Sequence, residues 1–97
     1  MKAETLDPSL PGADLVTQGM ADLAEGRTTE FSLLLLTAGP SLRRLGLEIP
    51  EHESDRPFNH LLYEKLEERL GDGAYSYYNS LIRRIVSYAQ ALERRRK

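Results

Sequence analysis

Leucine dominates the apolar part of this chain. Seventeen of its 97 residues are leucine, whereas valine and isoleucine together number only five. Because leucine favours helices and β-branched residues favour strands, this ratio predicts an all-α fold. No stretch of five residues between turn signals alternates apolar and polar positions as a half-buried strand does. The apolar residues instead recur at the three- and four-residue spacings of helices.

Glycine and proline divide the chain into its expected helices. Gly26, Gly46 and Gly71 each follow a periodic stretch, and Gly39-Pro40 interrupts the most apolar one. Glycine often ends a helix, and proline either breaks a helix or begins a new one. The stretch from Phe31 to Leu36 is apolar on nearly every side, which predicts the central, most buried helix. We therefore predict a compact four- to five-helix bundle with helices near 13–25, 29–38, 41–46, 57–70 and 73–95.

The length of the chain fits one domain, which we place at 12–97 after a flexible tail over 1–11. The absence of cysteine excludes disulfides, thiol catalysis and cysteine-based metal sites. Glu4, Asp7 and Pro8 interrupt any secretory signal, and no apolar run approaches the about 20 residues of a membrane span. We expect a cytoplasmic protein without a metal site or a cofactor.

The last expected helix carries an unusually wide apolar arc of roughly 220°. Four of the five tyrosines of the chain lie on it. Tyrosine is favoured where one end of the ring is dry and the other is wet, as at protein interfaces. Three short neighbouring helices cannot readily cover such an arc, so we expect a protein partner or a homodimer to cover the rest. The predicted interface consists of Tyr75, Tyr77, Tyr78, Leu81, Arg84, Ile85, Tyr88 and Leu92.

The near-neutral net charge of −2 hides a strong asymmetry. Residues 73–97 hold six cations and one acid (6 − 1 = +5), and residues 1–72 hold seven cations and 14 acids (7 − 14 = −7). A nucleic-acid-binding regulator is therefore our alternative hypothesis, because clustered arginines contact phosphates well. Its contacts would be Arg43, Arg44, Arg83, Arg94, Arg95 and Arg96. The competing interpretation is that the terminal cations complement the negative end of the helix dipole.

Arg84 differs from the other cations because it lies between Tyr77 and Tyr88 on the apolar flank. We expect it to stack on a tyrosine or to pair with an acid of the helix at 57–70.

Arg56 and His60 form the only Arg/His cluster at a helix start. The cluster resembles part of the Arg-polar-x-x-x-His motif of small helical RNases of the HEPN type. Only three residues separate Arg from His here, fewer than in that motif, and we do not assign the chain to that family. The resemblance implies metal-independent RNA cleavage by acid–base chemistry. His52, which lies among acids in the proline-bracketed loop 50–57, is interpreted as a solvated loop residue and not as a metal ligand.

No glycine-rich phosphate loop and no Ser, His and carboxylate trio is present in the sequence. We therefore predict a small non-enzymatic protein-interaction module that self-associates through its final helix. The two alternatives are the nucleic-acid-binding regulator and an RNase-like protein that uses Arg56 and His60.

Overall fold

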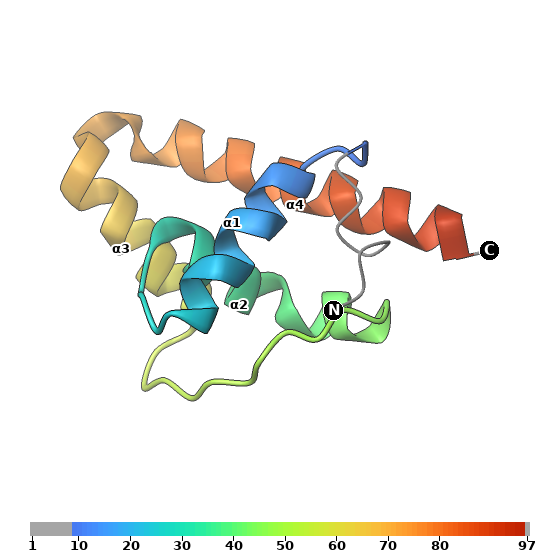
Figure 1. Ribbon diagram of the computed structural model, residues 1–97. Coiled ribbons are helices and arrows are strands. Elements are labelled where there is room, and N and C mark those ends of the chain that lie inside the picture. Colours follow the sequence, from blue (N-terminus) through green and yellow to red (C-terminus); the bar gives the residue numbers. More distant parts are fainter. Residues whose placement is uncertain (1–8, 97) are drawn as a thin grey trace.

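A computed structural model describes residues 9–96, and of Arg96 only the backbone. These residues form α1 (Ala13–Ala24), α2 (Glu30–Arg44), α3 (Phe58–Leu70), the 3₁₀ turn η2 (Gly71–Gly73) and α4 (Ala74–Arg96). No strand occurs among them, which confirms the all-α prediction. In Figure 1, α4 runs along the length of the molecule, and α3 folds back from its N-terminal end.

The number of helical stretches is smaller than we predicted. The described residues contain three uninterrupted stretches, at 13–24, 30–44 and 58–96, and the last is bent at η2 into α3 and α4. The bundle of four to five separate helices is therefore wrong. The ends of α1, α3 and α4 nevertheless lie within one residue of the predicted 13–25, 57–70 and 73–95.

The predicted break at Gly39-Pro40 is the main error, because 29–38 and 41–46 belong to the single helix α2. A proline normally disfavours the helical conformation of the preceding residue by a clash with that residue's Cβ. Gly39 has no Cβ, so this clash is reduced. Leucines on both sides of Pro40, including Leu36 and Leu42, are buried, and their packing holds the helix together through the proline.

α2 is the central helix, as predicted from its apolar surface. Its consecutive leucines Leu33, Leu34, Leu35 and Leu36 are all buried, and α1, α3 and α4 all pack against it. A run of four apolar residues covers every side of a helix, so one or two neighbours could not bury it. The position of α2 therefore follows from its composition.

Glycines end α1 and α2 in the same way. Gly26 and Gly46 adopt positive φ values of 73° and 102°. In each case the next residue donates its N–H to a carbonyl five residues earlier: Arg27 to Asp22 and Leu47 to Leu42. These are Schellman motifs, in which a left-handed residue satisfies the last carbonyls of the helix.

Two segments outside the helices add to the core. Leu47 and Ile49 are buried, and the following residues up to Pro57 form no element, as predicted for the loop 50–57. Residues 1–8 of the predicted flexible tail over 1–11 lie outside the described residues. The last part of the tail differs from that prediction, because Leu10 is buried against the core and the packed domain begins before residue 12.

α1 and α2 approach each other closely at Gly19. A Cβ at this position would lie 2.7 Å from both the side chain of Leu35 and the carbonyl oxygen of Phe31. The carbonyl belongs to the α2 backbone and cannot move aside alone. The absence of a side chain at Gly19 is therefore what allows the two helices to pack.

We expect Gly19→Ala to destabilise the fold. Overpacking a core costs about 1–3 kcal/mol, against a gain of about 1 kcal/mol in helix propensity. Because the clash involves backbone, the loss should dominate and lower the urea midpoint. Gly73→Ala is the matched control, since its Cβ would meet nothing closer than 4.0 Å and should not lower the midpoint. Equal midpoints for the two variants would contradict the close approach.

We expect Pro40→Ala to stabilise the protein. Proline inside a helix costs about 3 kcal/mol, whereas its removal loosens the unfolded chain by roughly 1 kcal/mol. Pro40 is exposed and lies within α2, so the net gain in the free energy of unfolding should be about 2 kcal/mol. Urea unfolding measures it, and a loss of stability would show that α2 needs the proline.

Candidate interaction surface

Four of the eight residues of the predicted interface on α4 are buried within the chain itself. Leu81, Ile85, Tyr88 and Leu92 are buried in the core, and Tyr88 is fully inaccessible. The N-terminus of α1 lies directly on this part of α4, because a Cβ at Gly12 would be 2.6 Å from the carbonyl oxygen of Arg84. These four side chains therefore face the other helices of their own chain.

The remaining predicted interface residues reach the surface to different extents. Tyr75 is 65% exposed, whereas Tyr77 and Tyr78 are half-buried. The guanidinium of Arg69 lies 5.4 Å from the centre of the Tyr77 ring, and Tyr78 packs edge to face on Tyr63 at 5.5 Å. Of these three tyrosines, Tyr75 and Tyr78 line a groove that a partner could enter.

Arg84 pairs with a different acid from the one we expected. Its Nη2 donates to both carboxylate oxygens of Asp14 at 3.0 Å. Asp14 lies in the first turn of α1, so neither a tyrosine nor an acid of α3 is the partner. Sequence spacing could not reveal this pair, because the two residues are 70 positions apart and meet only where α1 crosses α4.

An apolar groove between α2 and α4 was missed in the sequence. Val86 is 46% exposed, and Ile82 and Ala89 beside it are half-buried. The spacing of four and three between these residues is the signal that could have found the stripe. We call these three residues the α4 stripe. The groove encloses about 410 Å³, and its apolar walls are formed by Ala38, Leu42, Leu45, Ile82, Ile85, Val86 and Ala89.

A second groove lies where α3 meets the first turns of α4. It encloses about 450 Å³ and combines aromatic rings with carboxylates. No lysine or arginine of the described residues lines it. We call it the tyrosine–glutamate groove, and it is formed by Asn59, His60, Tyr63, Glu64, Glu67, Tyr75 and Tyr78.

The arginines proposed for nucleic acid lie in separate surroundings. Arg43 folds over Gly39 beside the 51–59 segment, and its buried Nε has no hydrogen-bond partner among residues 9–96. Arg44 lies at the rim of the α2–α4 groove and contacts Ser41. Arg83, Arg94 and Arg95 are exposed on α4, and the side chain of Arg96 lies outside the described part of the chain.

The residues considered for catalysis or metal binding lie in the segment before α3 and on the first turn of α3. Arg56 forms an ion pair with Glu64, and His60 lies in the tyrosine–glutamate groove. His52 lies in the segment between α2 and α3. Within residues 9–96, no group of three or more histidine and carboxylate side chains could hold a metal ion.

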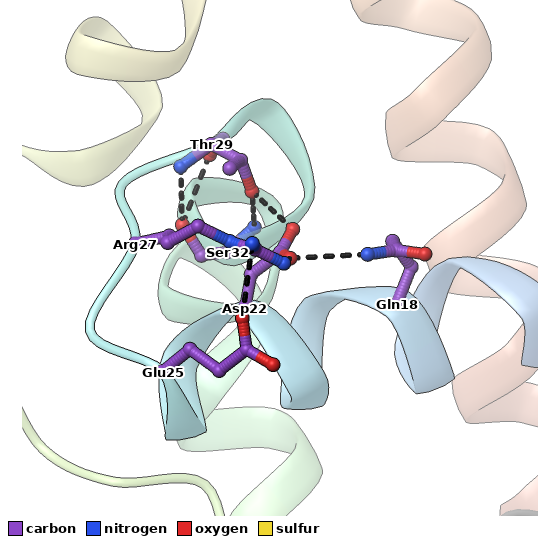
Figure 2. A network of polar contacts seen from close by, with 6 residues as sticks. All are labelled: Gln18, Asp22, Glu25, Arg27, Thr29 and Ser32. Atoms are coloured by element: carbon purple, nitrogen blue, oxygen red, sulfur yellow. Dashed lines mark hydrogen bonds and ion pairs between the residues drawn. The ribbon is translucent and has the colours of Figure 1, made fainter.

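Asp22 is a buried carboxylate that sequence reasoning overlooked. It lies near the end of α1 and accepts hydrogen bonds from Gln18 at 3.0 Å, Arg27 at 2.9 Å and Thr29 at 2.6 Å (Figure 2). Thr29 also accepts from the N–H of Ser32, and the Ser32 hydroxyl accepts from the N–H of Thr29. This reciprocal capping box begins α2.

The surroundings of Asp22 favour its charged form. The hydrogen bond from Thr29 and then that from Arg27 lower the pKa of Asp22 and outweigh the opposing effect of its burial. A carboxylate with three donors already in place has little capacity left for a substrate or a metal. The network therefore joins α1 to α2.

Comparison of the chain with family models, curated proteins and solved structures finds no match. Among the described helices, none has both the length and the hydrophobicity needed to cross a membrane.

We expect Asp22→Asn to lower the melting temperature at neutral pH, because the amide cannot accept all three hydrogen bonds. The folded-state pKa of Asp22 is lowered, so its stabilisation is complete above the unfolded pKa of about 3.9 and is lost as the pH falls through the folded value. The difference between wild type and variant should therefore shrink below about pH 4. Thermal melts across this range measure it.

Glu25→Gln is the control, since Glu25 is exposed and pairs only with the exposed Arg27. It should keep the pH dependence of the wild type. If Asp22→Asn also kept that dependence, the acid sensitivity would originate elsewhere.

Proposed function

We propose that this chain is a small, non-enzymatic interaction module of the cytoplasm that self-associates through α4. The proposal rests on the α4 stripe, which stays partly exposed although Leu81, Ile85, Tyr88 and Leu92 of the same helix are in the core. An apolar groove with a polar rim is typical of a protein-binding surface. The partner surface is thus shifted outward from the residues predicted by sequence, but it remains on the same helix.

Opposite charges on the two walls of the α2–α4 groove favour a second copy as the partner. Arg44 lies on the α2 wall and Glu93 on the α4 wall. In a two-fold interface every contact occurs twice, with the roles of the two copies exchanged. Each copy therefore brings both charges of this pair to the interface.

The positions of the cations support protein binding over nucleic-acid binding. Arg43 and Arg44 face different neighbours. A phosphate-binding edge needs cations that converge on one groove or face. The pairing of Arg56 with Glu64 likewise favours a non-enzymatic role, because RNA cleavage at His60 would need a nearby cation for the phosphate.

We expect the wild-type protein to form a concentration-dependent dimer and Val86→Glu to weaken it by roughly tenfold or more, since a charge would enter an apolar contact. Sedimentation velocity over a micromolar concentration series measures both. Ser87→Glu introduces the same charge at the next exposed position of α4, outside the groove, and should leave the dimer intact.

A wild-type protein that stays monomeric across the series would overturn the proposal. Equal weakening by the two glutamate variants would show that added charge, and not the α4 stripe, is responsible. Circular dichroism of each variant confirms that the helices are retained.

A further inference from the structure

The tyrosine–glutamate groove is suited to a cationic side chain. Tyr63 and Tyr78 meet edge to face, and the exposed Tyr75 completes an aromatic wall. Aromatic faces and carboxylates both attract guanidinium and ammonium groups. Glu64 is held by Arg56, whereas the carboxylate of Glu67 makes no hydrogen bond or ion pair with any described residue. The groove thus offers aromatic faces and a carboxylate that the described residues leave unpaired.

The chain itself carries a segment of matching charge. Residues 94–97 are four consecutive cations, Arg-Arg-Arg-Lys. Arg94 and Arg95 cannot reach the groove of their own chain, because α4 separates them from it by about 30 Å at 1.5 Å per residue. Figure 1 shows the C-terminal end of α4 far from α3, across a molecule whose longest dimension is 39 Å. Any contact between the two must therefore join two copies.

The α4 stripe lies near the middle of α4, which spans Ala74–Arg96. If two copies pack through these stripes in antiparallel orientation, the last turn of one α4 lies beside the first turn of the other. A parallel arrangement would instead place two basic ends together and align the two helix dipoles, and both effects are repulsive. The charges of α4 therefore favour the antiparallel arrangement.

We propose that the dimer is antiparallel and that the basic 94–97 segment of each copy docks in the tyrosine–glutamate groove of the other. This inference rests on the proposed self-association and adds a second pair of contacts to it. The central stripes supply the apolar contact, and the two grooves supply the charged contacts at its ends. The grooves also select the partner, since only a chain that ends α4 with cations fills them.

A charge exchange between groove and segment tests the proposal. One variant carries Glu67→Lys, and a second carries Arg94→Glu, Arg95→Glu and Arg96→Glu. Each variant alone should dimerise roughly tenfold more weakly than wild type, because both groove contacts become repulsive. In an equimolar mixture both contacts of the mixed dimer are attractive again, so dimerisation should return to within about threefold of wild type.

Sedimentation velocity with one variant fluorescently labelled measures the mixed dimer directly. Glu68→Lys is the matched control for the groove variant, because Glu68 is exposed on the same helix but does not line the groove. It should dimerise like wild type. Thermal melts exclude a loss of fold as the cause of weakening.

The remaining outcomes separate the two proposals. If Val86→Glu abolishes the dimer but neither charge variant weakens it, self-association stands and the docking of 94–97 is wrong. Weakening by the charge variants without recovery in the mixture also overturns the docking. A wild-type protein that is monomeric throughout overturns both.

Discussion

The burial of α2 is the constraint on which the rest of this structure depends. Four consecutive buried leucines leave no side of the helix free for water, so three other helices must surround it. Burying one leucine side chain stabilises the fold by about 2 kcal/mol, which makes this run the largest local source of stability. The close approach at Gly19 follows from the same requirement, because α1 must lie against leucines that it cannot displace. Even Pro40 is accommodated within the helix, since ending α2 there would leave Leu42 without its buried position.

This constraint also shapes the surface of α4. The helix turns Leu81, Ile85, Tyr88 and Leu92 toward the core, and Ile82, Val86 and Ala89 remain beside the contact with α2. The apolar arc of α4 is wider than its neighbouring helices can cover. The uncovered part of this apolar surface is where we propose that a second molecule binds. Aromatic residues mark the border and not the centre of this surface: Tyr77 packs under Arg69, and Tyr75 and Tyr78 line a separate groove. The arrangement gives α4 one face that packs in the core and one partly exposed apolar face, through which we propose that it binds a second copy.

Some features of the fold depend only on residues that are close in sequence, and these can be predicted from local patterns. The ends of α1, α3 and α4, the caps at Thr29 and Gly26, and the central place of α2 all follow from residues close in sequence. The continuation of α2 through Pro40 could not be predicted in this way, because it depends on packing by other helices. The pairs Arg84–Asp14 and Arg69–Glu30 join residues 70 and 39 positions apart, and no spacing rule relates them. The α4 stripe has a visible spacing, but only the fold decides which apolar residues of α4 stay uncovered.

The order in which the helices contact one another has a consequence for synthesis of the chain. α1 packs on α2, α2 on α3 and α3 on α4, so most contacts join neighbours in sequence and can form quickly. The contact of α1 with α4 is different, because Gly12 meets Arg84 only after everything between them has been made. In a growing chain, α1 can therefore pack on α2 early. The leucines that α4 covers in the folded protein remain exposed to water until α4 has left the ribosome. During this interval the nascent protein is most vulnerable to aggregation and most dependent on chaperones.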